Sequence, residues 1–294
     1  MNKKFLGLVG ILFFTLACGL GTPSTPLPAE QSVETVVAAT FQALTAIPPV
    51  VEASATTPAE ATQDSGQLTP DGTPVNMAEV SFLIPNGIAN DASSTMTTEV
   101  EFPYINPSNG DMPQHVKVLL NLYALNGTLY EPHILIFRSD EYAQYTENTA
   151  NIISAMQSLQ YVDGQPLPES LGSDFMAQTH AINFKNGHGV RYLTQVFTNF
   201  NPVNNSDLIY YYQGITDDGK YYVEAILPIG ASFLAADDNI NTPLPADGIP
   251  FDMNNFQGYL DAVAQRLNST DTFSFTPYLD YLDAMIESMQ VTGY

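Results

Sequence analysis

The 294-residue chain is poor in basic residues and has almost no cysteine. It holds 8 Lys and Arg against 31 Asp and Glu, which gives a formal net charge of −23. Proteins that bind nucleic acids neutralise phosphates with clustered Lys and Arg, so this composition excludes a nucleic-acid partner. With one cysteine, the chain can form neither an internal disulfide nor a Cys-rich metal site.

Apolar residues make up 45% of the chain, which is enough to build a folded core. The sequence contains no Gly-x-Ser-x-Gly nucleophile motif, no His-Glu-x-x-His zinc motif, no Walker loop and no dinucleotide-binding fingerprint. It therefore gives no direct indication of a catalytic activity.

The N-terminus has the pattern of a secretory signal. Lys3 and Lys4 precede an apolar run over residues 5–17, and this run is too short to span a hydrocarbon core of about 30 Å. Gly19 and Pro23 follow it and do not continue a helix. We therefore predict a signal peptide over residues 1–17 that directs the chain out of the cytoplasm.

The end of this run, Thr15-Leu16-Ala17-Cys18-Gly19, resembles the lipobox of bacterial lipoproteins. The resemblance implies diacylglycerylation of Cys18, cleavage after Ala17, and anchoring at the cell membrane on the side facing away from the cytoplasm. An ordinary cleaved signal with an incidental cysteine is the alternative. Because anionic headgroups repel so acidic a chain, the lipid would tether the domain without drawing it onto the surface.

Residues 18–75 differ in composition from the rest of the chain. Thr, Pro, Ala and Ser dominate them, and Phe41 is their only aromatic residue. The segment has too little apolar surface to offset the conformational entropy that its chain would lose on folding. It is therefore predicted to be a disordered spacer. Aromatic content and periodic patterns rise from Asn76, and residues 76–294 are predicted to form one domain.

The patterns in this domain predict strands, then a helix, then two hairpins, then helices. The fold class is therefore α+β, an antiparallel sheet with helices packed on its faces. Asn186-Gly187 and Asp217-Asp218-Gly219 are the predicted hairpin turns, and Ser139 is the predicted N-cap of the first helix. The predicted strands cover residues 79–84, 97–102, 116–123, 133–138, 179–184, 190–198, 208–215 and 220–227, and the predicted helices cover 139–159, 256–267 and a segment opening at Thr276-Pro277.

The Tyr-rich second hairpin ends in Leu227-Pro228, and a C-terminal helix over residues 282–291 follows later. Together they resemble the end of PsbP-like α/β/α sandwich domains and of uncharacterised bacterial lipoproteins. That resemblance implies an accessory or assembly role without catalysis.

Tyr210 and Tyr212 share one face of a predicted strand, and Tyr222 lies on the partner strand. An exposed row of these rings is one hypothesis, because such a row stacks on a sugar or contacts a protein. Packing of the same rings in the core is the other. The chain has no tryptophan, which sugar sites often use.

Two sets of residues are candidates for metal binding. Asp237, Asp238 and Asn239 offer oxygen ligands for weak binding of Ca²⁺, with ordinary solvated loop residues as the alternative. His180 and His188 lie on one hairpin and, with Asp174, would suit zinc or iron; the alternative places one at the turn and one on the sheet surface. No other cofactor is indicated.

These observations favour a membrane-anchored extracytoplasmic lipoprotein that acts as a non-catalytic binding or accessory module, with a protein or glycan as the partner. The alternatives are a cell-envelope hydrolase acting on polysaccharide, which needs two carboxyl groups across a cleft, and a solute-binding receptor.

Overall fold

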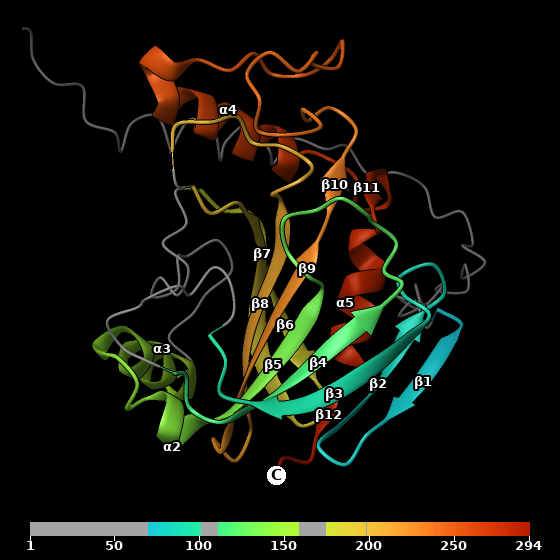
Figure 1. Cartoon of the computed structure of the whole chain (residues 1–294), viewed down its shortest axis with the longest axis vertical. Helices are drawn as coiled ribbons and strands as arrows, with labels where there is room; N and C mark the ends of the chain where they lie inside the picture. Colours follow the sequence, from blue (N-terminus) through green and yellow to red (C-terminus); the bar gives the residue numbers. More distant parts are fainter. Residues whose placement is uncertain (1–69, 101–110, 159–174, 198) are drawn as a thin grey trace, which may run out of the picture. The chain divides into compact units, whose positions relative to one another are not determined.

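A seven-stranded antiparallel sheet is the framework of the computed structural model (Figure 1). The structure describes residues 70–100, 111–158, 175–197 and 199–294, all within one compact unit, Asp64–Tyr294. The spatial order of the strands is β3-β4-β5-β9-β8-β7-β6. Their bounds are β3 Asp91–Thr97, β4 His115–Asn121, β5 His133–Arg138, β6 Ala177–Phe184, β7 Gly187–Thr194, β8 Ile209–Thr216 and β9 Tyr221–Pro228.

Two small antiparallel sheets accompany the large one. The first has the order β1-β2-β12 and the second pairs β10 with β11. Their bounds are β1 Gly72–Asn76, β2 Val80–Pro85, β12 Gln290–Val291, β10 Gly230–Ala231 and β11 Phe275–Thr276. Since β1 pairs along its whole length with β2, the folded part begins at least four residues before Asn76, inside the predicted spacer.

The predicted hairpins are confirmed. β6 and β7 pair up to Phe184 and Gly187, on either side of the turn that Asn186 marks. β8 and β9 pair through a turn whose Gly219 has a φ of +70°, a backbone conformation that glycine adopts without strain. Turn chemistry alone therefore located both hairpins.

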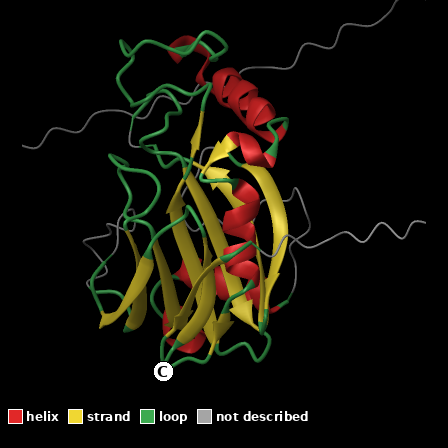
Figure 2. Ribbon diagram, turned by 90° about the vertical axis from the view of Figure 1, so that its right-hand side faces the viewer, coloured by secondary structure: helices red, strands yellow, loops and turns green. Residues whose placement is uncertain are grey.

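Side chains of the large sheet alternate between two cores. Along β8, Tyr210 and Tyr212 face the core beneath helix α5 (Leu279–Glu287), while Tyr211 and Ile215 face the core beneath helix α3 (Glu147–Gln157). We call these the α5-side core and the α3-side core. Figure 2 shows helices against the strands, as expected for an α+β fold, so the predicted class is confirmed.

The predicted helix over residues 139–159 is wrong as a single element. The chain forms a short helix α2 (Ser139–Tyr142) and then α3, because the Thr146 hydroxyl caps α3 by accepting from the Thr149 backbone N–H at 3.0 Å. Ser139 is the first residue of α2, and the N-cap is Arg138.

One predicted strand is also misplaced. Residues 98–100 are not a strand and 101–110 lie outside the described residues, whereas β3 ends at Thr97. β3 is a largely exposed, Ser/Thr-rich edge strand, so it lacks the apolar alternation on which strand prediction depends. Helix α4 (Phe256–Asn268) is confirmed, and so is the existence of α5. The predicted ends of α5 are wrong: its N-cap is Tyr278, Thr276 lies in β11, and residues 290–291 form β12 because they pair with β2. No helix in the described ranges has the length and apolarity needed to cross a membrane.

A bidentate ion pair ties α5 to the large sheet. Arg191 of β7 donates through Nε to Asp283 Oδ1 at 3.1 Å and through Nη2 to Oδ2 at 3.0 Å. The side chains of Arg191 and Asp283 are 4% and 15% exposed. Burial raises the pKa of the Asp283 carboxyl, against the lowering effect of Arg191.

We expect Asp283→Ala to lower the free energy of unfolding by about 3–5 kcal/mol, because it leaves the Arg191 guanidinium buried without its counter-charge. Asp247→Ala is the matched control: Asp247 pairs with Arg266 at 3.3 Å in an exposed position, so its loss should cost less than about 1 kcal/mol. Urea denaturation of both variants measures the difference. Equal, small effects would contradict a structural role for the buried pair.

Candidate functional site

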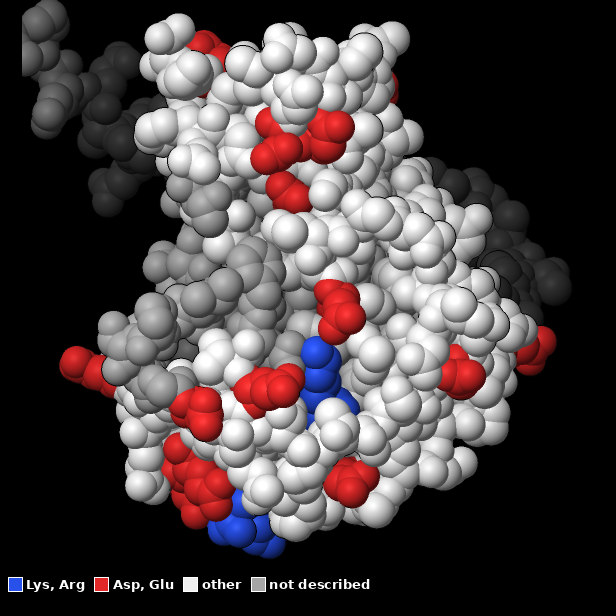
Figure 3. All heavy atoms as spheres, in the orientation of Figure 1, with Lys and Arg blue, Asp and Glu red and all other residues white. Residues whose placement is uncertain are grey.

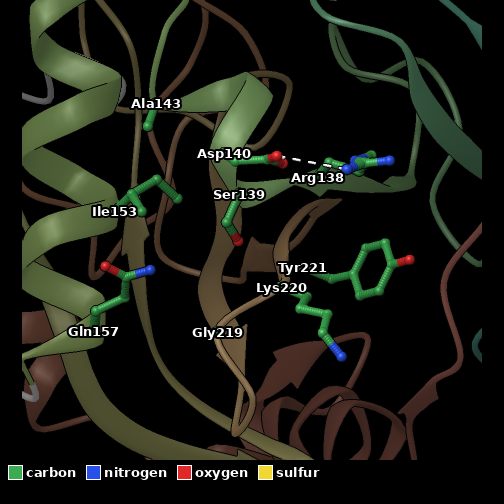
Figure 4. A pocket seen from close by; sticks show the side chains of 9 residues that line it. All are labelled: Arg138, Ser139, Asp140, Ala143, Ile153, Gln157, Gly219, Lys220 and Tyr221. Carbon is green, nitrogen blue, oxygen red and sulfur yellow. Dashed lines mark hydrogen bonds and ion pairs between the residues drawn. The ribbon is translucent and has the colours of Figure 1, made fainter.

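A pocket of about 520 Å³ lies where β5 passes into α2, beside the turn between β8 and β9 (Figure 4). Pairing of β5 with β9 brings the two segments together, since Arg138 lies opposite Tyr221 in the register. The Ser139 backbone N–H donates to Lys220 O at 2.8 Å and fixes their separation. The lining residues are Arg138, Ser139, Asp140, Ala143, Ile153, Gln157, Gly219, Lys220 and Tyr221.

The pocket is lined by charges of both signs, and its cations pair with carboxylates in or beside it. Arg138 Nη2 lies 3.5 Å from Asp140 Oδ2, and Arg138 Nε lies 3.3 Å from Glu141 Oε1. Lys220 Nζ lies 2.8 Å from Asp218 Oδ2. Figure 3 shows the same pattern on one face of the molecule, where acidic side chains are widespread and the few basic ones lie near them.

The cations hold both carboxyl groups ionised. The hydrogen bond from Arg138 lowers the pKa of Asp140. Hydrogen bonds from Lys220 and from the Thr216 hydroxyl lower the pKa of Asp218 to about 2. At neutral pH both carboxyl groups are therefore ionised, and neither holds a proton to donate.

Ser139 contributes a buried hydroxyl. Its side chain is 3% exposed, and its Oγ has no hydrogen-bond partner among the described residues. Figure 4 shows the Oγ pointing into the space between α2 and the Gly219–Lys220 turn. This oxygen is itself buried, so it is not exposed to a ligand in the pocket.

Tyr221 lines the pocket, and its ring, which points away from Ile153 and Gln157 in Figure 4, is held in place. Its hydroxyl donates to Tyr294 O at 3.1 Å, and the two rings lie 6.0 Å apart. The Tyr294 hydroxyl donates to Gln114 O at 2.6 Å, and burial raises the pKa of Tyr294 to about 12. Gly293 has a φ of +75°, and a Cβ there would overlap the Tyr221 ring. These contacts fix the position of the Tyr221 ring.

The tyrosines proposed from the sequence lie elsewhere. Tyr210 and Tyr212 are fully buried in the α5-side core and Tyr222 in the α3-side core. The hypothesis of an exposed row is wrong, because both faces of the central strands are covered, and the packing alternative accounts for these rings. The Tyr212 hydroxyl donates to Ile182 O at 3.1 Å, and Gln213 Nε2 donates to the Tyr222 hydroxyl at 2.7 Å.

The predicted calcium ligands lie in a surface loop. The Asp237 carboxylate accepts from the Asn239 backbone N–H at 3.1 Å and from the Thr242 hydroxyl at 2.5 Å. Its hydrogen bonds therefore stabilise its own loop. Asp238 is exposed. Within the part of the chain that the structure describes, no three His, Cys, Asp or Glu side chains are grouped to hold a metal ion.

The histidine pair is not brought together. His180 lies opposite Arg191 and His188 opposite Asn183, three positions apart along the ladder. His188 Nδ1 lies 3.4 Å from Asp217 Oδ1. The remaining candidate residues, Asp174 and the lipidation site Cys18, lie outside the described residues.

Sequence reasoning missed the pocket residues. Arg138 and Lys220 are two of only eight basic residues, and each lies at a strand end beside acidic residues. That placement is a signal, but it does not reveal that the two strand ends meet. Neither a scan against models of known families nor a search of curated proteins finds a match for the chain.

We predict that the Asp218 carboxyl titrates with a midpoint of about 2. A carboxyl whose pKa is lowered by folding stabilises the fold above its unfolded value of 3.8, and this contribution is lost as the pH falls toward 2. Lys220→Met should raise the midpoint toward 3.8, whereas Arg138→Met should raise that of Asp140 alone. NMR titration of the side-chain carboxyl carbons measures both, and a midpoint near 3.8 in the unchanged protein would contradict the geometry.

Proposed function

We propose that the chain is a lipid-anchored extracytoplasmic binding module that holds a neutral glycan unit in the pocket of Figure 4. The lipobox-like segment ending in Cys18 supports the anchor, and the Thr/Pro-rich composition of residues 18–75 supports a tether that sets the reach of the domain. The PsbP-like resemblance supports an accessory role for the domain.

The preformed polar pocket is the observation that carries this proposal. Its volume of about 520 Å³ falls in the range of small-ligand sites. Its cations are neutralised by Asp140, Asp218 and Glu141, so it offers little net attraction to an anion. Its charged side chains offer both hydrogen-bond donors and acceptors, which suit a ligand with many hydroxyl groups.

The ionisation of the carboxyl groups favours binding over hydrolysis. A glycoside hydrolase needs one protonated carboxyl group to donate to the leaving oxygen. Asp140 and Asp218 have lowered pKa values because of their cationic neighbours, so neither suits that role. A solute receptor usually closes two lobes around its ligand, whereas the described residues belong to one compact unit.

Removal of side chains that line the pocket should weaken glycan binding. We expect calorimetry with chitotriose, maltotriose and cellotriose to detect binding of at least one, and Tyr221→Ala to weaken it at least tenfold because Tyr221 lines the pocket. Lys220→Met should also weaken it. Lys185→Met, the same change at another exposed lysine, is the control and should leave binding unchanged. Binding that is equal in all variants, or absent from the unchanged protein, would refute the glycan site.

The anchor is tested separately from the pocket. In detergent phase separation of the bacterial membrane fraction, the full-length chain should enter the detergent phase and Cys18→Ser should stay in the aqueous phase, because only the thiol accepts the lipid. Mass spectrometry of the mature protein should find Cys18 at its N-terminus carrying acyl chains. A Cys18→Ser variant that partitions like the unchanged protein would exclude lipidation.

A further inference from the structure

Three aromatic side chains meet on the surface just before and within α5. Phe273 lies in the short 3-10 helix Thr272–Ser274, Tyr278 precedes α5, and Tyr281 lies near its start. Phe273 and Tyr278 are each 45% exposed, although both are large aromatic residues. We call Phe273, Tyr278 and Tyr281 the aromatic corner.

The rings of the aromatic corner lie close together, and their planes are nearly perpendicular to one another. The centroids of Phe273 and Tyr278 lie 5.4 Å apart at 71°, those of Tyr278 and Tyr281 5.4 Å apart at 79°, and those of Phe273 and Tyr281 6.4 Å apart at 83°. Rings that stack on a sugar present one flat surface, so these angles exclude a three-ring platform. Each pair of rings makes an edge-to-face contact, so the three rings point their faces in different directions.

Exposed ring faces suit a cation better than a neutral group. A ring face attracts a cation within ~6 Å of its centroid, and Phe273 and Tyr278 are both accessible to solvent. Aromatic faces recognise quaternary ammonium groups, whose charge is spread over methyl groups and weakly hydrated.

The surrounding charge has the matching sign. Asp280 lies in sequence between two of the rings, and its Oδ2 accepts from the Thr272 hydroxyl at 2.9 Å. Asp271 precedes the first ring, and its carboxylate accepts from the Phe273 backbone N–H at 2.9 Å. The sequence from residue 267 to 294 contains no Lys, Arg or His. The field at the aromatic corner therefore attracts cations.

A second cavity adjoins the aromatic corner. It has a volume of about 240 Å³ and shares Tyr278 and Tyr281 with the corner. The turn after β2 supplies Asn86, whose side chain is exposed and offers both a donor and an acceptor. The remaining lining residues are Gly87, Ile88, Ala124, Phe275, Thr276 and Pro277. This space has the size for the short polar tail of a small ligand.

We propose that the aromatic corner binds the quaternary ammonium group of a small soluble cation such as choline, whose hydroxyl tail enters the adjoining cavity. The site is separate from the pocket of Figure 4, because the two share no lining residue. A lipid-anchored protein with both sites would hold two chemically different ligands at once.

Calorimetry with the full chain tests this proposal against its nearest alternatives. Choline and tetramethylammonium are titrated beside 3,3-dimethylbutan-1-ol, which has the shape of choline without its charge. We expect choline to bind at least tenfold more tightly than the neutral isostere, because the attraction of the ring faces requires the charge.

Matched variants assign the binding to the rings. Phe273→Leu and Tyr278→Leu should each weaken choline binding at least tenfold, and Tyr278→Phe should retain it because the ring face is kept. Phe200→Leu, at another exposed ring that is 66% accessible, should leave it unchanged. Thermal unfolding of each variant shows that the fold is intact, and Lys220→Met should not alter choline binding.

Several results would overturn the proposal. Equal affinity for choline and its neutral isostere would mark a merely apolar cavity. Binding of chitotriose at the aromatic corner without binding of choline would mark a sugar site. Binding to phosphatidylcholine vesicles without binding of free choline would assign the site to a membrane surface instead of a small solute. Failure of both cations to bind would leave the aromatic corner without this function.

Discussion

Burial of the β8–β9 hairpin on both faces is the constraint on which the rest of the fold depends. Every residue of β8 is buried, and only Tyr221 of β9 is partly exposed. Because side chains of successive residues point to opposite faces, these strands need a core on each side, which α3 and α5 provide. The turn of this central hairpin is therefore held in place, and it brings Lys220 and Tyr221 against the end of β5.

The candidate site is a consequence of that placement. Strand pairing sets Arg138 opposite Tyr221, and the backbone bond from Ser139 to Lys220 closes the gap between the two strand ends. The charged side chains then pair with carboxylates from their own turns, which balances their charge. Because backbone hydrogen bonds hold the two strand ends together, the pocket exists before a ligand binds, which lowers the ordering cost of binding.

The sequence predicted those structural features, turns and buried strands, that depend on residues close together in the chain. Asn186-Gly187 and Gly219 located both hairpins, and the alternation of β4 and the continuous apolar run of β5 predicted their burial. The helix from Ser139 was predicted as one element because the cap at Thr146 uses two threonines, a weaker signal than Thr with Glu. The pocket was not predictable, since Arg138 and Lys220 meet only through pairing of strands distant in sequence. Periodicity also does not tell whether Tyr210 and Tyr212 face solvent or a second core.

A crystal structure of the protein soaked with a neutral oligosaccharide that it binds tests the central claim most directly. The account predicts sugar density in the pocket of Figure 4, in contact with Arg138, Lys220 and Tyr221, with the Arg138 and Lys220 ion pairs unchanged. Sugar bound at another surface while this pocket stays unchanged would contradict it.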